Sequence, residues 1–254
     1  MIVKFTKMHS CGNDYIYVFG DIPYPEKLAA EASRRRFSIG SDGLVLLGED
    51  EKGNKTMRIY NADGSRARIC GNALKCSGCL FSREYGENDL VISTDAGERR
   101  VRVKGDEASV YFPFDGITKL SRGSVTAEGA EYEYDLIDVG NPHRVFFGNI
   151  PSGDFLLRHG KTFNASDETN ADFVEVLSRD EIKLRFYERG SGETLSCGSG
   201  TVAAYYAALF RGVTDRKVRA VSAGGVQTID NDGEAIILTS GVSVAFRGEY
   251  EYRI

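Results

Sequence analysis

The chain has 254 residues, of which 41% are hydrophobic and 27% are charged, and its formal net charge is −5. This composition is that of a globular protein and excludes a disordered one. The acidic balance argues against nucleic acid or an anionic membrane surface as the main partner. The sequence has neither a run of about 18 apolar residues nor an apolar signal segment at its start. We therefore expect a cytoplasmic protein that binds neither nucleic acid nor a membrane.

Short alternating segments rich in β-branched and aromatic residues, bounded by Gly, Asp and Asn, predict strands along the whole chain. In the first half they lie at 2–5, 15–19, 44–47, 56–60, 89–93, 99–103 and 109–112. In the second half they lie at 133–139, 144–147, 172–177, 181–187, 217–220, 226–230, 235–239 and 242–247. A surface helix is predicted at 25–37, where charged and apolar residues are interleaved. We expect the basic residues at 34–36 to form its solvated end.

Two further helices are predicted at 71–85 and 198–211, and they differ from the surface helix. Apolar residues occupy nearly every face of both segments, which indicates helices surrounded by protein. Gly86 follows the first and Gly212 the second, as expected for left-handed helix caps. Each segment therefore predicts a central helix wrapped by strands.

Residue pairs recur about half a chain apart. The pairs are Arg58/Arg185, Tyr60/Tyr187 and Cys70/Cys197, at a spacing of 127 residues, and Gly12-Asn13/Gly140-Asn141, at a spacing of 128. A coincidental likeness of two helix starts is one interpretation, but the recurring strand, loop, Cys-Gly and buried helix favour a duplicated half. We predict two similar α+β domains, 1–115 and 116–254, that meet in the region of 115–130, with the last strand free to pack back on the first domain.

The chain has five cysteines and no secretion signal, so thiols are expected rather than a disulfide framework. Cys70 and Cys197 each begin a predicted buried helix and are followed by small residues. Backbone N–H groups at a helix start can bind an anion, and a thiol there has its pKa lowered from about 8.5. Two such helices that face each other would hold one carboxylate between two thiols.

This arrangement suits the inversion of a carbon next to a carboxylate. One cysteine as thiolate removes the proton, and the other as thiol returns a proton from the opposite face. The carbanion moves charge onto the carboxylate, where the N–H donors stabilise it. Such a reaction needs no cofactor and no metal.

Seven motifs resemble those of the diaminopimelate epimerase family and occur in the same order. They are Gly12-Asn13-Asp14, Asn61-Ala62-Asp63-Gly64-Ser65, Cys70-Gly71-Asn72, Gly140-Asn141-Pro142-His143, Tyr187-Glu188-Arg189-Gly190, Gly192-Glu193-Thr194 and Cys197-Gly198-Ser199-Gly200. The resemblance implies epimerisation of LL-diaminopimelate to the meso form without pyridoxal phosphate, for lysine and peptidoglycan synthesis. It also implies two pseudo-symmetric α+β domains, each a strongly curved, mostly antiparallel sheet around a buried helix, with a cleft between them, and a homodimer.

The resemblance also assigns roles to single residues. Cys70 and Cys197 match the acid–base pair. The residues whose backbone amides would hold the reacting carboxylate are Gly71, Asn72, Gly198 and Ser199. The residues whose side chains would contact the rest of the substrate are Asn13, Asn61, Asn141, Asn170, Glu188 and Arg189.

The sequence departs from the family pattern at three places. This chain has Met8-His9-Ser10-Cys11 where many members have Met-His-Gly before the Gly-Asn-Asp motif, and Ala73 follows Cys-Gly-Asn where glycine is usual. Gly43 replaces a glutamine that contacts substrate in some relatives. These changes leave open a related two-thiol racemase for another amino acid, such as histidine, although the distal polar residues argue for diaminopimelate.

A thiol-based metal or redox protein is the alternative from a different class. Cys76-Ser77-Gly78-Cys79 has the CxxC spacing of such sites, but it falls inside a helix expected to be buried. Packing cysteines are the better interpretation. His143 matches a family motif and is equally well explained as a satisfied, partly buried histidine. Glu193 is expected to orient its loop as a buried acceptor without touching substrate.

Overall fold

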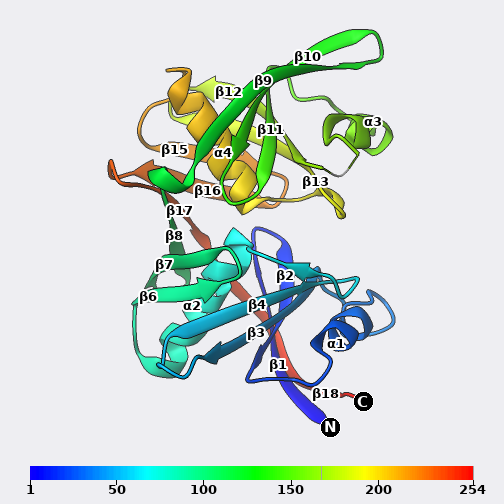
Figure 1. Cartoon of the computed structure of the whole chain (residues 1–254), viewed down its shortest axis with the longest axis vertical. Coiled ribbons are helices and arrows are strands. Elements are labelled where there is room, and N and C mark those ends of the chain that lie inside the picture. Colours follow the sequence, from blue (N-terminus) through cyan, green and yellow to red (C-terminus); the bar gives the residue numbers. More distant parts are fainter. Residues whose placement is uncertain (167, 254) are drawn as a thin grey trace. The chain divides into compact units, whose positions relative to one another are not determined.

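The computed structural model describes residues 1–166 and 168–253 and divides into two compact units (Figure 1). The first unit comprises Met1–Val110 together with the C-terminal residues from Ser240 on, and the second comprises Tyr111–Thr239. The division between them falls within a strand on each of the two connecting segments. The sequence predicted a boundary between two domains at residue 115. That boundary stays a prediction.

The first unit contains nine strands and two helices among its described residues. The strands are β1 (Ile2–Ser10), β2 (Asn13–Phe19), β3 (Gly43–Glu49), β4 (Lys55–Asn61), β5 (Arg66–Ala67), β6 (Asp89–Thr94), β7 (Gly97–Lys104), β8 (Glu107–Pro113) and β18 (Ser243–Glu251). The helices are α1 (Pro25–Ala32) and α2 (Gly71–Tyr85). The strand order is β18-β1-β2-β3-β4-β6-β7-β8. Only the β2–β3 and β4–β6 pairs are parallel among the pairings described for this unit.

The second unit has the same plan. Its strands are β9 (Thr118–Ala127), β10 (Ala130–Asp138), β11 (Pro142–Phe147), β12 (Asn170–Ser178), β13 (Glu181–Glu188), β14 (Gly192–Thr194), β15 (Val218–Ser222), β16 (Gly225–Asn231) and β17 (Ala235–Gly241). Its helices are α3 (Phe155–Phe163) and α4 (Gly198–Phe210), preceded by a 3-10 turn at Phe114–Gly116. The order is β9-β10-β11-β12-β13-β15-β16-β17, with β11–β12 and β13–β15 parallel.

The two units therefore share one topology, which confirms the α+β fold with a duplicated half. In each unit a helix connects the first parallel pair (α1 or α3), and a short strand precedes the buried helix (α2 or α4). The C-terminal strand β18 pairs with β1 and so occupies in the first unit the place that β9 has in the second. The duplication thus places Cys70 and Cys197 at equivalent points of two equivalent units.

The helix α2 is buried because strands surround it. It contacts β1, β2, β4, β6 and β7, and in Figure 1 these strands curve around it. A Cβ atom on Gly78, in the middle of α2, would lie 2.5 Å from Cγ1 of Val101, so only glycine permits this approach to β7. Gly86 ends the helix in the left-handed conformation at φ 77°, as predicted.

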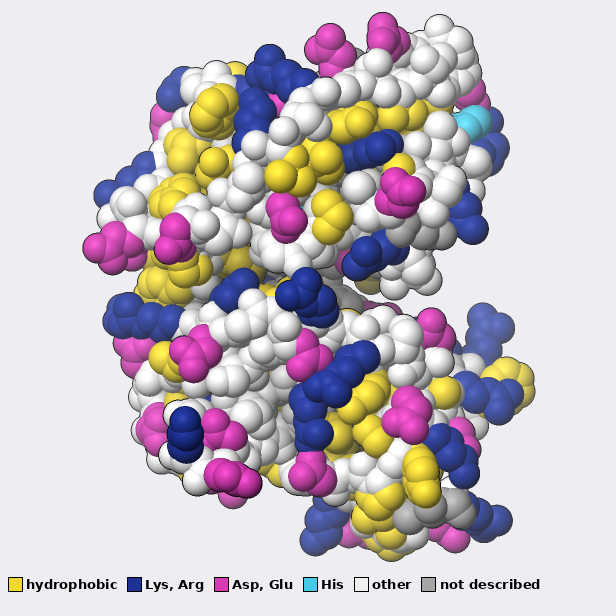
Figure 2. Space-filling model, in the orientation of Figure 1, with side chains coloured by type: hydrophobic (Ala, Val, Ile, Leu, Met, Phe, Trp, Pro, Cys, Tyr) yellow, Lys and Arg dark blue, Asp and Glu magenta, His cyan; other side chains and the backbone are white. Residues whose placement is uncertain are grey.

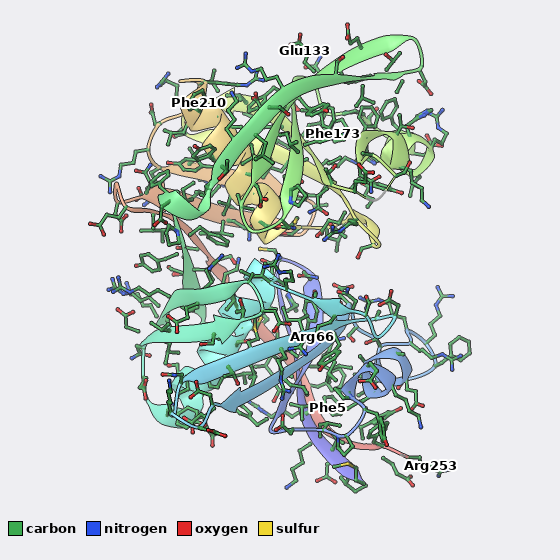
Figure 3. All side chains as sticks on the ribbon, in the orientation of Figure 1. Phe5, Arg66, Glu133, Phe173, Phe210 and Arg253 are labelled. Carbon is green, nitrogen blue, oxygen red and sulfur yellow. The ribbon has the colours of Figure 1, made fainter. Side chains whose placement is uncertain are left out.

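The second unit has an aromatic core beneath α3. Phe173, labelled in Figure 3, stacks on Phe146 with ring centroids 5.0 Å apart and meets Phe163 edge-on at 5.1 Å. The sequence did not predict α3, because Gly160 and short apolar runs weaken its helical pattern. Gly160 is required there, since a Cβ would lie 2.1 Å from the Tyr187 ring. The repeat predicts a counterpart of the first surface helix about 128 residues further along the chain, and this signal could have revealed α3.

Two other predictions need correction. The surface helix α1 ends at Ala32 and not at residue 37, because Gly40 N–H bonds to the Ala32 carbonyl and the chain turns back after Ser33. The exposed basic residues at 34–36 therefore follow the helix and do not form its end. The region 115–130 contains the strand β9, and the junction of two domains expected there stays a prediction.

The surface carries charges of both signs. On the face drawn in Figure 2, basic and acidic side chains are interspersed on each unit. Within residues 1–166 and 168–253, no helix is both long and apolar enough to span a bilayer.

Candidate functional site

Cys70 forms the N-cap of α2. Its backbone is extended, at φ −142° and ψ 118°, and its Sγ accepts a hydrogen bond from the Ala73 N–H at 3.4 Å. The first N–H groups of a helix have no partner within the helix, so the amides of Gly71 and Asn72 belong to the turn that can receive an anion. The structure therefore places the thiol and the predicted carboxylate-binding amides of the first unit together.

Asn13 lies beside this thiol. It follows a tight hairpin turn formed by Cys11 and Gly12, with φ 52° and 78°, which joins β1 to β2. The Cys70 thiol donates to Asn13 Oδ1 at 3.2 Å, and Asn13 Nδ2 donates to Asp42 Oδ2 at 2.7 Å. Asp42 is a residue of this site that the sequence analysis did not assign.

Asn61 ends β4 and opens the turn that leads toward α2. Its Nδ2 donates to Ser65 Oγ at 3.0 Å, and Asp63 accepts from both the backbone N–H and the hydroxyl of Ser65. The Asn-Ala-Asp-Gly-Ser motif is therefore a side-chain-stabilised turn. It presents Asn61 in a partly exposed position from which its amide can reach a ligand.

Cys197 repeats the arrangement in the second unit. It is the N-cap of α4, with φ −127° and ψ 116°, and its Sγ accepts from the Gly200 N–H at 3.4 Å. Ser199 Oγ lies 3.5 Å from the same sulfur. Gly198 and Ser199 begin the helix, so their amides correspond to those of Gly71 and Asn72.

The expected lowering of the thiol pKa at a helix start is wrong for Cys197. Burial raises the pKa of this thiol well above its usual value, and the nearby charges of Glu188 and Asp172 raise it further. Hydrogen bonds from Ser199 and the Gly200 N–H oppose the increase without cancelling it. Desolvation of a thiolate in this site thus outweighs the helix N-terminus, and Cys197 needs a neighbouring base to lose its proton.

Glu188 lies where it can serve as such a base. It ends β13, and Thr194 on β14 donates its hydroxyl hydrogen bond to Glu188 Oε1. Burial raises the pKa of the Glu188 carboxyl, while hydrogen bonds from Thr194 and from the Cys197 thiol act in the opposite direction. A carboxyl group with a raised pKa, bonded to a thiol, can accept and return that thiol's proton.

His143 connects three of the predicted site residues of the second unit. Its Nε2 lies 3.1 Å from Ser199 Oγ, 3.3 Å from Asn170 Nδ2 and 3.3 Å from Asn141 Oδ1. The parallel β11–β12 register pairs His143 with Asn170 directly. The histidine is completely buried, and not partly buried as one interpretation had it.

Asp172 holds the other side of this ring. Its Oδ2 lies 2.7 Å from His143 Nδ1, and it too is fully buried. Sequence analysis did not single out Asp172. An acidic residue two positions after Asn170 in a strand, on the same face and among apolar neighbours, is the signal that could have found it.

Arg189 lies at the tip of the β13–β14 hairpin. Its backbone N–H donates to Asn170 Oδ1 at 2.9 Å, which fixes the orientation of the Asn170 amide. Its side chain is exposed and extends from a three-residue turn. Glu193, on the returning strand, forms a two-pronged ion pair with Arg185 at 2.6 and 3.0 Å and so orients this hairpin. Glu193 is half-buried and not buried as predicted, because it lies on the short strand β14 beside the exposed turn.

The structure accounts for two of the departures from the family pattern. Ser10 is buried, and its hydroxyl oxygen lies 2.8 Å from the hydroxyl oxygen of Ser240. The Ser240 hydroxyl accepts a hydrogen bond from the buried Lys75 ammonium at 2.5 Å. At Gly43, a Cβ atom would lie 2.1 Å from the Tyr60 carbonyl oxygen. A glutamine therefore does not fit at position 43 of this backbone.

Cys76 and Cys79 lie in the interior of α2. Both are buried thiols, and burial raises the pKa of Cys76 to about 12 and that of Cys79 to about 11. Thiols that stay protonated are poor nucleophiles and poor metal ligands. Across residues 1–166 and 168–253, no three His, Cys, Asp or Glu side chains are grouped as a metal site requires.

Comparison of the sequence with known families and proteins identifies its relatives. The description of the diaminopimelate epimerase family matches residues 5–117 and 136–245. The diaminopimelate epimerase of Parabacteroides distasonis is 37% identical over 263 residues, which cover 97% of each chain. That of Methanococcus maripaludis strain C6 is 33% identical over 98% of this chain and 100% of its own.

Solved structures share the fold at low sequence identity. A hydroxyproline epimerase from Agrobacterium vitis superposes with a TM-score of 0.73 at 13% identity, over 98% of this chain and 92% of its own. A phenazine biosynthesis protein of the PhzF family from Bacillus anthracis gives 0.68 at 15% identity, over 99% and 100%. These matches confirm the predicted fold class.

Proposed function

The chain belongs to the diaminopimelate epimerase family, and we propose that it converts LL-diaminopimelate to the meso form with Cys70 and Cys197 as its two acid–base groups. The observation that supports this assignment is the equivalence of the two thiols. Each caps the N-terminus of the buried helix in its own unit, and each sulfur accepts a hydrogen bond from the N–H three residues later. In the proposed reaction the two thiols act on one substrate carbon.

The proton transfers follow from this arrangement. Glu188 takes the Cys197 proton, and the thiolate then removes the α-hydrogen, so that a C–H bond breaks and an S–H bond forms. The electron pair moves onto the substrate carboxylate, where N–H groups at the starts of α2 and α4 stabilise it. The Cys70 thiol gives its proton to the opposite face of the carbon. The reverse reaction exchanges the roles of the two thiols.

The remaining polar residues bind the rest of the substrate in this proposal. A distal carboxylate calls for a guanidinium, which Arg189 provides on an exposed hairpin. A distal ammonium calls for acceptors such as the amide oxygens of Asn13, Asn61 and Asn141. Asn170 is held by the Arg189 backbone and by His143, so it contributes a fixed amide. The proposed steps use no cofactor and no metal.

The proposal extends to cellular context and assembly. We propose a cytoplasmic enzyme of lysine and peptidoglycan precursor synthesis that works as a homodimer. Sedimentation equilibrium gives its mass in solution, and a mass of one chain at working concentrations would contradict the dimer.

The alternatives predict different measurements. A two-thiol racemase for histidine would use the same cysteines and exchange the α-proton of histidine. A thiol redox protein would depend on Cys76 and Cys79, whose buried, protonated state argues against it.

The decisive experiment is proton NMR of LL-diaminopimelate in D2O with reduced protein and no added cofactor. Loss of the α-proton signal together with appearance of the meso isomer supports the proposal. If folded, reduced protein leaves the signal unchanged, diaminopimelate is not the substrate. A panel of amino acids beginning with histidine then tests the related racemase.

A further inference from the structure

The side-chain amide of Asn13 contacts two different partners within the first unit. Its Oδ1 accepts from the Cys70 thiol at 3.2 Å, and its Nδ2 donates to Asp42 Oδ2 at 2.7 Å. A carboxylate only accepts hydrogen bonds, so the opposite amide orientation would place two acceptor oxygens against each other. The carboxylate of Asp42 therefore determines which end of the amide faces the sulfur.

Asp42 is itself held in place from several directions. The Arg35 guanidinium donates to its Oδ1 at 2.9 Å, and the Asp14 backbone N–H donates to its Oδ2 at 3.0 Å. Arg35 and Lys7 also pair with the Asp14 carboxylate, next to Asp42. These contacts fix the carboxylate oxygen toward which the Asn13 amide must turn its nitrogen.

The orientation of the amide has a chemical consequence for Cys70. A carbonyl oxygen stabilises an S–H donor and disfavours a thiolate, whereas an amide N–H does the opposite. We propose that Asp42 is a positioning residue that, by holding the Asn13 oxygen toward Cys70, keeps Cys70 as a thiol in the unliganded enzyme and so reserves it as the proton donor. This inference rests on the proposed two-thiol reaction and adds what sets the resting state of one thiol.

Other groups act on the same sulfur. Lys75 and Cys76 on α2 and Tyr17 on β2 interact electrostatically with Cys70. The Lys75 ammonium favours a thiolate, while ionised Tyr17 or Cys76 would oppose one. Asn13 thus offsets the attraction of Lys75. If Asp42 is removed, the Asn13 amide can rotate and donate to sulfur, and both neighbours then favour the thiolate.

The test measures the reactivity of Cys70 in the whole, reduced protein. Because only thiolates react, the iodoacetamide alkylation rate at several pH values reports the protonation of each cysteine. Trypsin separates Cys70, on peptide 69–75, from Cys76 and Cys79 on peptide 76–83. We expect Asp42→Ala to alkylate about tenfold faster at Cys70 near neutral pH, which corresponds to a downward shift of about one pKa unit.

A matched control removes a carboxylate that does not contact Asn13. Asp95 forms a two-pronged ion pair with Arg66 in the same unit, so Asp95→Ala should leave the Cys70 rate unchanged. If Asp42→Ala does not fold, Asp42→Asn replaces it. The new asparagine amide can rotate to accept from the nitrogen of the Asn13 amide or to donate to its oxygen, so it no longer fixes the orientation of that amide. Asp42→Asn should then also accelerate the alkylation of Cys70.

A double-variant cycle separates the amide from the simple loss of a negative charge. In an Asn13→Ala background, Asp42→Ala should no longer accelerate alkylation of Cys70. Equal acceleration in both backgrounds would overturn the inference, as would an unchanged rate in the folded single variant. Alkylation requires no turnover, so this outcome is distinguishable from a failure of the NMR test of the proposed function.

Discussion

His143 Nδ1 lies 2.7 Å from Asp172 Oδ2, and both side chains are completely buried. The Asn170 amide is fixed by the Arg189 backbone, so it directs its Nδ2 toward His143 Nε2. A carboxylate only accepts hydrogen bonds, so Nδ1 of the ring carries a proton that Asp172 accepts. Asp172 thus sets the tautomer that positions the polar residues near Cys197.

Replacing this carboxylate should impair both stability and turnover. Asp172→Ala leaves a buried N–H without its acceptor, so we expect a loss of about 1–3 kcal/mol in the free energy of unfolding. Displacement of the neighbouring site residues should lower turnover by about 100-fold. Urea unfolding and α-proton exchange measure the two effects, and Asp172→Asn, which retains an acceptor oxygen, should recover part of each. Unchanged turnover in folded Asp172→Ala would show that His143 needs no such support.

The two helix-capping thiols should be individually indispensable. Cys70→Ala and Cys197→Ala each remove one proton carrier, so we expect epimerisation to fall at least 1,000-fold, on the order of the loss of a general acid or base. Cys79→Ala is the matched control, because it removes a buried thiol from the interior of α2. It should retain turnover while losing some stability through lost packing.

For the cysteine variants, circular dichroism must show that each protein is folded. Near-normal turnover of either Cys70→Ala or Cys197→Ala would exclude the two-thiol assignment. Loss of turnover in folded Cys79→Ala would instead support a role for the CxxC segment.

The sequence predicted much of this fold because its signals are local or repeated. Each of the two buried helices is apolar all round, and the α2 boundaries at 71 and 85 agree with prediction. The strands follow their alternating patterns. By contrast, the sequence patterns of α3 and β9 are weaker, and these two elements form because tertiary packing favours them. The predicted domain boundary at residue 115 stays a prediction. The division between the two compact units falls within continuous strands, where no local sequence pattern marks it.

The site was predicted where motifs are contiguous and missed where contacts are long-range. Cys70 and Cys197 are identified by their positions at helix starts. Asp42 and Asp172 act through Asn13 and His143, each 29 residues away in the chain. No spacing rule connects such residues, because their contacts depend on strand register. The pKa of Cys197 was mispredicted for a related reason, since burial is a property of the folded unit.

Gly43 marks a place where this chain should not tolerate the glutamine of some relatives. A Cβ there would lie 2.1 Å from the Tyr60 carbonyl oxygen, and that carbonyl belongs to the paired strand β4. We expect Gly43→Ala to cost about 2–3 kcal/mol in unfolding free energy, as for overpacking. Gly116→Ala is the control, because its Cβ would meet nothing within 4 Å. Equal urea midpoints for both variants would contradict the steric argument.

The buried Lys75 should make stability depend on pH. Burial lowers the pKa of its ammonium from 10.5 to about 8, while the unfolded chain keeps the ordinary value. Between these two values the unfolded chain binds a proton that the folded chain does not, so stability rises with pH across this window. Conversely, that stability is lost as the pH falls toward 8. The full effect is about 3 kcal/mol for a shift of this size.

Lys75→Met isolates this contribution, because methionine keeps an unbranched side chain without the charge. Below about pH 8 we expect the variant to be more stable than the native protein by up to about 3 kcal/mol. The advantage should shrink toward zero as the pH approaches 10.5. Cys79, whose raised pKa reduces stability at alkaline pH, is present in both proteins and cancels in the difference. Cys76 interacts with Lys75, so loss of the ammonium raises the pKa of this thiol further in the variant. A stability difference that stays constant between pH 8 and 10.5 in urea titrations would show that Lys75 is not destabilised by burial.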